Sequence, residues 1–242
     1  MTLHGQHVLV MGGSSGIGAA SARRLAAQGA AVTITGRDES KLAATAAGID
    51  GKVITARLDA TDPAQIAGFF AADTVYDHLV LALSGASGAG PLATLDLDDL
   101  AAGFDGKFWP HVRILQAALP HLSDRASLTI ITAASARSAL PGTAGLAAIN
   151  GALEAMVPPL AAELAPRRVN AISPGVIDTP WWSGLSDAER QATFDGFSAM
   201  LPLKRVGTAD EVAHTVEYAV SNGYLTGSVL ECDGGAHLGS AG

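Results

Sequence analysis

Short apolar runs rich in β-branched residues alternate along the chain with alanine-rich segments of helical period. Apolar runs of this length, separated by helix-length segments, are typical of parallel strands that crossover helices bury on both faces. The pattern predicts a Rossmann-type, doubly wound α/β fold with a parallel sheet of about seven strands. The expected strands are HVLVMG, AVTITG, KVITARLD, HLVLALSG, SLTIITAA, RVNAIS and GSVLECDGG.

Glycine and proline indicate where helices begin, bend and end. The first crossover helix is expected to begin near Ile17 and to stop at Gly29. Pro110 and the Pro158–Pro159 pair each lie inside a long helical stretch. Because proline removes a backbone donor and its ring clashes with the preceding turn, we expect both helices to kink or break.

Composition limits the class of protein. A chain of 242 residues with 48% hydrophobic residues fits a single domain over 1–242. A net charge of −8 without a basic run gives no electrostatic basis for binding nucleic acid or an anionic membrane. Cys232 is the only cysteine, no paired metal-ligand spacing occurs, and no apolar stretch is expected to reach the about 20 residues of a membrane span. We therefore expect a soluble, cytoplasmic protein without a metal site.

The first expected strand runs directly into GGSSGIG and then into a helix. Glycines allow a tight turn and a close approach of the backbone, and a helix N-terminus offers free N–H groups to a pyrophosphate. A plain structural turn is the alternative, but the strand before and the helix after it are the context that a phosphate motif demands. The expected phosphate-binding residues are Gly12, Ser14, Ser15, Gly16, Ile17 and Gly18.

The second expected strand ends in TGRDES. Gly36 stands where NAD-binding folds place an acid for the ribose 2′-hydroxyl, and Arg37 follows directly. Arg37 would meet a 2′-phosphate with a planar fork of donors, which favours NADP(H) over NAD(H). A solvated surface arginine is the alternative, and the preference reverses if Asp38 points at the ribose.

Further motifs follow in order along the chain. Residues 11–18 match the pattern TGxxxGxG, with Met11 in place of threonine, and RLDATD, SPGVIDTP and TGSVLECDGG follow. Over essentially its whole length the chain thus resembles the short-chain dehydrogenase/reductase family. The resemblance implies that the ends of the third and sixth strands contact the adenine, the nicotinamide carboxamide and the phosphates. The residues concerned are Asp59, Ala60, Pro174, Gly175, Val176 and Thr179.

The segment after the fourth strand departs from the family pattern Asn-Asn-Ala-Gly. The chain has Ala82, Leu83, Ser84 and Gly85 there, so it keeps the glycine and lacks the asparagine that helps to tie the central strands together. Ser84 and Gly85 are still expected beside the cofactor.

The resemblance also implies a catalytic tyrosine, lysine, serine and asparagine, and the chain replaces all four. Leu146 takes the tyrosine position, Asn150 the lysine, Ala133 the serine and Lys107 the asparagine. Leucine cannot exchange a proton and alanine cannot donate a hydrogen bond. The family's usual alcohol/ketone chemistry is therefore not available in its usual form.

Two of these replacements are reciprocal, because lysine and asparagine exchange sites that face one another in the family. We hypothesise that the ammonium has moved to the opposite wall, where Lys107 polarises an oxyanion or protonates an alkoxide. Asn150 is expected both at the catalytic centre and at the cofactor ribose. The alternative is drift after catalysis was lost, with Lys107 extending to solvent.

Other polar residues are expected near the same cavity. Ser135 is the third catalytic candidate, although a serine just past a strand more often caps the next turn. Thr132 and Arg137 are its polar neighbours. His111 lies one helical turn beyond Lys107 and is expected to be an uncharged histidine on the helix surface.

Trp181 and Trp182 begin the segment, about 181–203, that forms a substrate lid in the family. An aromatic pair there suits a flat or apolar substrate or, alternatively, a subunit contact. The following SDAE is typical of a capping box and predicts an ordered helix over 186–200.

These residues favour an NADP(H)-dependent oxidoreductase that reduces a carbonyl, imine or activated alkene of a small molecule. A nucleotide-binding sensor or scaffold without turnover is one alternative, and a non-redox enzyme that holds NADP structurally is another. The family resemblance further implies a homodimer or homotetramer.

Overall fold

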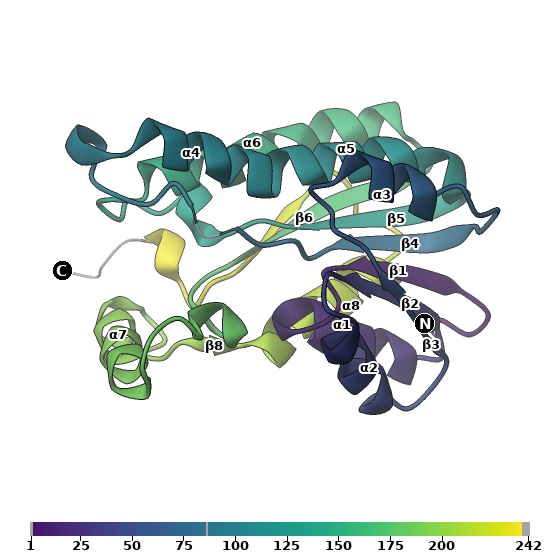
Figure 1. Ribbon diagram of the computed structural model, residues 1–242, viewed down its shortest axis with the longest axis horizontal. Coiled ribbons are helices and arrows are strands. Elements are labelled where there is room, and N and C mark those ends of the chain that lie inside the picture. The colour runs from purple at the N-terminus through teal and green to yellow at the C-terminus, as the bar shows by residue number, and fades with distance from the viewer. Residues whose placement is uncertain (1, 86, 239–242) are drawn as a thin grey trace.

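The computed structural model describes residues 2–85 and 87–238 and confirms the predicted Rossmann-type fold (Figure 1). Seven strands form one sheet in the order β3-β2-β1-β4-β5-β6-β9, and every neighbouring pair is parallel. Met1 and residues 239–242, at the ends of the expected domain, lie outside the described residues. The strands are β1 (His7–Met11), β2 (Ala31–Gly36), β3 (Val53–Arg57), β4 (Tyr76–Leu81), β5 (Leu122–Ile131), β6 (Arg168–Pro174) and β9 (Val229–Cys232).

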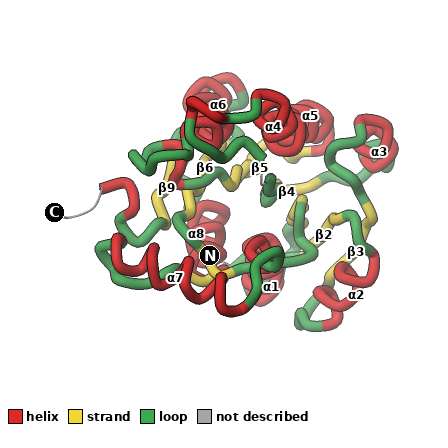
Figure 2. The backbone as a smooth tube through the Cα atoms, turned by 60° about the vertical axis from the view of Figure 1, so that its left-hand side comes forward, coloured by secondary structure: helices red, strands yellow, loops and turns green. Residues whose placement is uncertain are grey.

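Helices cover both faces of the sheet (Figures 1 and 2). One face carries α1 (Gly16–Ala27), α2 (Glu39–Ala47) and α8 (Ala209–Ser221). The other carries α3 (Pro63–Phe69), α4 (Leu97–Gly103), α5 (Trp109–Ala118) and α6 (Ala144–Glu163), with short 3-10 turns at Leu92–Thr94 and Leu119–His121. The strand order reverses between β1 and β4, and ligands of such sheets bind beyond the carboxyl ends of the strands at that point.

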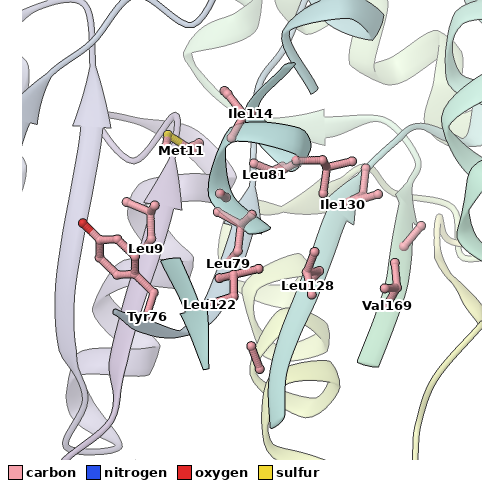
Figure 3. Close-up of a cluster of buried hydrophobic side chains, with 14 of the residues drawn as sticks. Leu9, Met11, Tyr76, Leu79, Leu81, Ile114, Leu122, Leu128, Ile130 and Val169 are labelled. Carbon is pink, nitrogen blue, oxygen red and sulfur yellow. The ribbon is translucent and has the colours of Figure 1, made fainter. Parts of the chain in front are cut away.

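Alternate residues of each strand face opposite helix layers. Leu9 and Met11 of β1 join one buried cluster with Ile114 of α5 (Figure 3), whereas Val8 and Val10 pack into the cluster beneath α1 and α8. Burial on both faces is the reason that the central strands read as continuous apolar runs in the sequence, whereas the edge strand β3 leaves Ile54 and Thr55 exposed.

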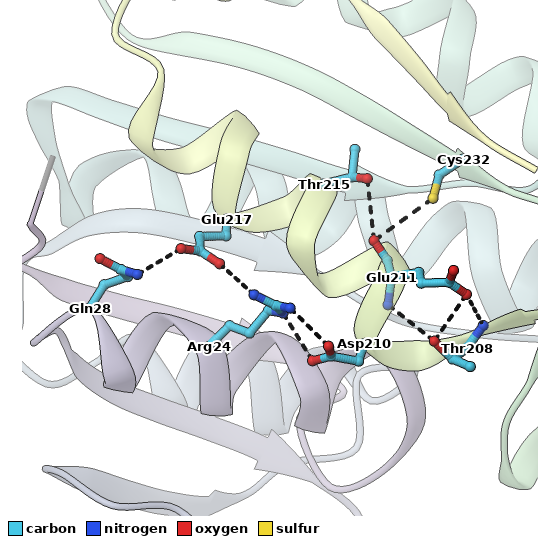
Figure 4. Close-up of polar contacts among 8 residues, drawn as sticks. All are labelled: Arg24, Gln28, Thr208, Asp210, Glu211, Thr215, Glu217 and Cys232. Carbon is cyan, nitrogen blue, oxygen red and sulfur yellow. Dashed lines mark hydrogen bonds and ion pairs between the residues drawn. The ribbon is translucent and has the colours of Figure 1, made fainter.

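A polar contact joins α1 to α8, although these helices are far apart in the sequence (Figure 4). The Arg24 guanidinium forms ion pairs with Asp210 at 2.8 Å and with Glu217 at 3.0 Å. Glu217 also accepts a hydrogen bond from Gln28 at 2.7 Å. These contacts hold α1, and therefore the turn before it, against the sheet.

The two helical stretches in which a proline was expected to cause a kink or break behave differently. The stretch around Pro110 is interrupted, as predicted, by a π-helical turn, η2 (Phe104–Phe108), directly before α5. α6 runs through both prolines without interruption, so a break at Pro158–Pro159, one of the two outcomes expected there, is wrong. Leu153 and Val157 are buried beside them, and this tertiary packing outweighs the lost backbone hydrogen bonds.

α6 also corrects the expectation that no stretch of the chain is long and apolar enough for a membrane span. Among the described helices, α6 alone meets that requirement by length and composition. It contacts β6 and buries Ile149, Leu153 and Val157, as the core helix of a soluble protein also does.

The expected lid lies between β6 and β9. The lid expected over about 181–203 includes most of η5 (Pro180–Trp182) and all of α7 (Asp187–Met200). It is flanked by β7 (Ile177–Asp178) and β8 (Gly207–Thr208), which pair with each other. The predicted capping box is confirmed: the Glu189 N–H donates to the Ser186 hydroxyl at 3.4 Å, and the Glu189 carboxylate accepts from the Ser186 N–H at 2.9 Å. Figure 1 shows α7 at the left, beyond the end of the sheet.

Candidate active site

The turn between β1 and α1 depends on glycine. Gly12 and Gly16 adopt φ angles of 80° and 54°, in the left-handed region that side chains disfavour. A Cβ atom at Gly12 would lie 2.5 Å from the Ala82 carbonyl oxygen, and one at Gly18 would lie 2.1 Å from the Gly12 oxygen. The glycines therefore let this turn approach the end of β4 and the start of α1 closely.

The N-terminus of α1 has free N–H groups. Ser15 takes the N-cap position without a capping hydrogen bond from its side chain, and the first turn holds no acidic residue. Side chains do cap α2, α3, α4, α7 and α8. Thr179 lies above the turn, with its Cβ 3.5 Å from where a Gly16 Cβ would be. This arrangement fits a pyrophosphate bound at the helix N-terminus.

The next strand end carries the residues expected at the adenosine ribose. Asp38 caps α2: its carboxylate accepts from the Ser40 hydroxyl at 2.6 Å and from the Lys41 N–H at 3.1 Å, and these hydrogen bonds lower its pKa. The Asp38 carboxylate is thus engaged with its own helix, while the Arg37 side chain is exposed. Arg57, which the sequence reasoning missed, donates its Nε–H to the Arg37 carbonyl at 3.3 Å. Arg57 pairs with Gly36 across β2 and β3, a register that the sequence alone does not give.

Asp59 lies at the end of β3, beside the expected adenine position and next to Ala60. Its Oδ1 accepts from the Thr61 N–H at 2.9 Å and from the Thr61 hydroxyl at 2.7 Å. These hydrogen bonds, and to a smaller extent the Arg37 charge, lower the pKa of Asp59. The carboxylate is therefore ionised and able to accept a hydrogen bond from an amino group.

The end of β6 and the end of β4 form the other side of the cofactor position. A Cβ at Gly175, which follows Pro174 and precedes Val176, would lie 2.7 Å from the Asp233 carbonyl oxygen, so this turn packs against the segment after β9. Ser84 is exposed, and Gly85 lies beside Lys107, whose Cβ is 3.5 Å from a Cβ built there.

Lys107 and Asn150 contact one another directly. The Lys107 side chain, from η2, is only 8% exposed and does not extend to solvent. Its Nζ donates to Asn150 Oδ1 at 2.7 Å and to the Thr132 carbonyl at 3.3 Å. An ammonium group has three N–H donors, so these two contacts leave one of them unused.

Asn150 links Lys107 to the third catalytic candidate. Its Nδ2 donates to the Ser135 hydroxyl at 3.2 Å and to the Leu146 carbonyl at 2.9 Å. Ser135 lies in a 3-10 turn, η4 (Ala134–Ala136), directly after β5. The structure thus brings Lys107, Asn150 and Ser135 together, from three different elements.

Burial changes the acidity of the Lys107 ammonium. Desolvation lowers the pKa of Lys107 to about 8, and the nearby Glu154 carboxylate partly opposes this shift. A lysine with this pKa is mostly protonated at neutral pH and loses its proton more readily than a solvated lysine does. Such a group suits general acid catalysis near neutral pH.

His111 corrects one expectation. It is fully buried rather than on the helix surface, and its Nδ1 bonds to the Lys107 carbonyl at 2.7 Å. Burial, reinforced by the Lys107 charge, lowers the pKa of His111 to about 4, which agrees with the expectation that it is uncharged. The helical spacing correctly puts Lys107 and His111 on one face of the helix. That face lies toward the sheet, so His111 is buried.

Glu154 is the residue of this site that the sequence reasoning missed. Its carboxylate is buried, and it accepts from the Thr132 hydroxyl at 2.8 Å and from Arg137 Nε at 2.9 Å. The signal was available: Glu154 lies four residues after Asn150, on the same helix face, in an otherwise apolar run.

The two tryptophans of the lid have different surroundings. Trp182 donates its Nε1–H to the Ile177 carbonyl at 2.9 Å and packs edge-on against Phe194 of α7, with ring centroids 5.6 Å apart. Trp181 is 48% exposed, and its Nε1 lies 3.5 Å from the Gly85 carbonyl, next to Lys107. Trp182 thus anchors the lid, and Trp181 is available to a ligand.

A doubly wound sheet with a glycine turn before an uncapped helix defines a dinucleotide-binding protein. A family model described as Enoyl-(Acyl carrier protein) reductase matches residues 12–237. An uncharacterised oxidoreductase of Methylorubrum extorquens is 33% identical over 96% of this chain and 98% of its own length. A glucose 1-dehydrogenase of Gluconobacter oxydans is 32% identical over 97% of this chain and 92% of its own.

The solved structures agree with this assignment. The structure of a small-chain dehydrogenase in complex with NADPH has a TM-score of 0.83 and 32% identity, and the match covers 97% of this chain and 99% of the other. The chain belongs to the short-chain dehydrogenase/reductase family, and its cofactor site is that of a nicotinamide dinucleotide.

Proposed function

We propose that this protein is an NADP(H)-dependent oxidoreductase that reduces a carbonyl, imine or activated alkene of a small molecule and uses Lys107 to handle the proton. The observation that carries the proposal is the buried Lys107 ammonium, which Asn150 and Thr132 orient beside Gly85. When bound, the reduced nicotinamide supplies a hydride to the substrate carbon.

The side chains of this site then act on the substrate heteroatom. The free N–H of Lys107 stabilises the negative charge that develops on that atom and transfers its proton there, which leaves a neutral amine that solvent reprotonates. Asn150 Oδ1 and the Thr132 carbonyl keep Nζ in position, and the hydrogen bond from Asn150 Nδ2 to Ser135 holds the amide in the required orientation. An iminium substrate, already protonated, accepts the hydride without a proton from Lys107, so for such a substrate this wall supplies shape alone.

The preference for NADP(H) over NAD(H) is part of the proposal. Asp38 is engaged as a helix cap, while Arg37 is exposed at the end of β2 with Arg57 on the neighbouring strand. Two guanidinium groups at this edge favour the extra phosphate of NADP(H). The relative bound to NADPH is consistent with this preference.

We also propose that the protein acts as a homodimer or homotetramer in the cytoplasm. Away from the sheet, α6 exposes small or apolar residues that suit helix packing between subunits, namely Ala148, Ala155, Pro158, Pro159 and Ala162. Size-exclusion chromatography with light scattering tests this assembly, and a monomer at all concentrations contradicts it.

The function is tested by mixing the protein with NADPH and a panel of ketones, imines and enones while the absorbance of the reduced cofactor is followed. Lys107→Met is expected to lower turnover at least about 10²-fold, because positioned acid catalysis contributes that much. Calorimetry should give an NADPH Kd within a few-fold of the original. Lys52→Met, which removes an exposed lysine, is the control.

Three results would change this conclusion. Full activity of Lys107→Met rejects the role of the lysine. Tight NADPH binding without oxidation for every substrate favours the sensor or scaffold. Conversion of a substrate without change in the cofactor favours a non-redox enzyme.

A further inference from the structure

Lys107 is the inner end of a chain of polar groups that alternate in charge. The Thr132 residue lies between the first two charges: its carbonyl accepts from Lys107 Nζ at 3.3 Å, and its hydroxyl donates to Glu154 Oε1 at 2.8 Å. Glu154 and Lys107 are both buried, so their charges act on each other through a medium of low dielectric.

Arg137 connects this buried pair to the protein surface. Its Nε pairs with Glu154 Oε2 at 2.9 Å, and its Nη1 pairs with Glu231 Oε1 of β9 at 2.5 Å. The Arg137 side chain is 36% exposed, whereas that of Glu154 is 8% exposed. The guanidinium is therefore a partly solvated counter-ion shared between one buried and one outer carboxylate.

The outer end of the chain lies near the C-terminus. Glu231 contacts His237 Nε2 at 3.1 Å, and His237 Nδ1 contacts the buried Asp233 carboxylate at 2.8 Å. Glu231 and His237 line a cavity of about 470 Å³ between β9, η6 (Ala236–Leu238) and the lid. The chain of contacts thus runs from the candidate active site to this cavity.

We propose that Glu154 and Arg137 are positioning residues that set the proton affinity of Lys107 in opposite directions. The Glu154 carboxylate stabilises the ammonium, and Arg137 neutralises part of that carboxylate and so limits its effect. Together they keep Lys107 protonated at neutral pH without making it a poor acid. The catalytic consequence rests on the function proposed above, but the electrostatic coupling itself does not.

The other groups that face Lys107 are uncharged or more distant. His111 from α5 is buried and neutral, Asn150 from α6 is an amide, and β5 contributes the Thr132 backbone carbonyl. Among the described residues, Glu154 is the anionic side chain whose charge raises the pKa of Lys107 against the effect of burial. Removal of the Glu154 carboxylate should therefore lower the pKa of Lys107, because its charge then no longer offsets the desolvation of the ammonium.

The test measures the protonation of Lys107 directly, by nuclear magnetic resonance of protein that carries ¹³C in the ε-carbon of lysine. The sequence contains only four lysines, Lys41, Lys52, Lys107 and Lys204, so few signals appear. The Lys107 signal is the one that disappears in Lys107→Met. Its titration is followed without cofactor or substrate, and thermal melting verifies the fold of each variant.

Glu154 and Arg137 form one ion pair, and substitutions of the two residues should shift the Lys107 titration in opposite directions. Glu154→Gln should move the Lys107 titration to lower pH by about one unit, because an opposite charge at short range raises the pKa of an ammonium by about that amount. Arg137→Met should move the titration to higher pH, because the Glu154 charge is then no longer shared. Arg137→Lys keeps the charge and should restore a value close to the original.

Glu231→Gln is the matched control, since it removes a carboxylate from the same arginine without changing Glu154. It should move the titration by much less than Glu154→Gln does. If Glu154→Gln and Arg137→Met shift the titration in the same direction, or leave it unchanged, the proposal is wrong. A shift of the expected signs in a protein that shows no turnover would retain this coupling and reject the catalytic proposal alone.

Discussion

The two halves of the candidate site are built from different parts of the chain. The phosphate half consists of backbone: the turn of Gly12, Gly16 and Gly18 and the uncapped start of α1. The reacting half consists of side chains, chiefly Lys107 and Asn150, that reach one another from different helices. A backbone site tolerates little substitution, because a Cβ at Gly12 or Gly18 would collide with backbone atoms and Gly16 adopts a positive φ, whereas the side chains of the other half can be replaced without moving the backbone.

This difference between backbone and side chains is a physical reason for keeping the family pattern in the phosphate half while the reacting half departs from it. The phosphate half retains the glycine spacing even though Met11 replaces the usual threonine. The reacting half carries Leu146 and Ala133 where the family pattern has a tyrosine and a serine. On the function proposed above, the chain binds the cofactor as the family does while different side chains move the proton.

The largest effect is expected from a glycine in the phosphate half. Gly18→Ala places a Cβ 2.1 Å from the Gly12 oxygen, so the turn must shift, and the loss of two hydrogen bonds to a charged phosphate, at about 1.5–3 kcal/mol each, weakens binding at least about 10²-fold. Calorimetry should show NADPH binding weakened by that factor or more. Gly106→Ala, where a Cβ meets no atom within 4 Å, is the control beside Lys107 and should bind NADPH normally. Normal NADPH binding by Gly18→Ala would contradict the assignment of the phosphate half to this turn.

Arg37→Ala tests the choice of cofactor within the phosphate half. Loss of a hydrogen bond to a charged group costs about 1.5–3 kcal/mol, so NADPH binding should weaken about 10- to 100-fold while NADH binding stays nearly constant. Arg125→Ala removes an exposed arginine near the opposite end of the sheet and serves as the control. Equal weakening of both cofactors would show that Arg37 does not contact the 2′-phosphate.

The two halves should also differ in their response to pH. The ammonium form of Lys107 donates the proton in reduction, and this form is lost as pH rises through its pKa of about 8. The reduction rate should therefore fall about tenfold per pH unit above that value, while the NADPH Kd changes less. Stopped-flow reduction and calorimetry over the same pH range measure the two quantities. A flat rate profile up to pH 10 contradicts the role of Lys107.

The smallest effect is expected in the lid. Trp181→Ala removes an exposed ring near Gly85 and should raise KM several-fold with little change in kcat, because a ring of this size contributes mainly contact area to binding. Trp182→Ala should instead lower the thermal stability, since Trp182 packs against Phe194 and donates to Ile177. An unchanged KM for Trp181→Ala would favour a subunit contact for this residue.

The seven strands, the glycine turn and the capping box at Ser186 were predicted from the sequence alone and are confirmed. Each of these depends on residues that are close together in the chain, through the periodicity of apolar positions or through local hydrogen bonds. The uncharged state of His111 was also predicted. The family resemblance predicted that the Lys107 and Asn150 sites face one another through water, whereas the structure has a direct hydrogen bond between them. The replacement of the catalytic set stays a prediction from that resemblance.

The remaining features of the site depend on tertiary packing. The burial of His111, the continuity of α6 through Pro158–Pro159 and the pairing of Glu154 with Arg137 all depend on how helices pack against the sheet. Lys107 and Asn150 are 43 residues apart, and a hydrogen bond of 2.7 Å between them requires both helices to be placed correctly on the sheet. Local patterns specify which face of a helix is apolar, but contacts between side chains of different elements are set by the packing of the whole domain.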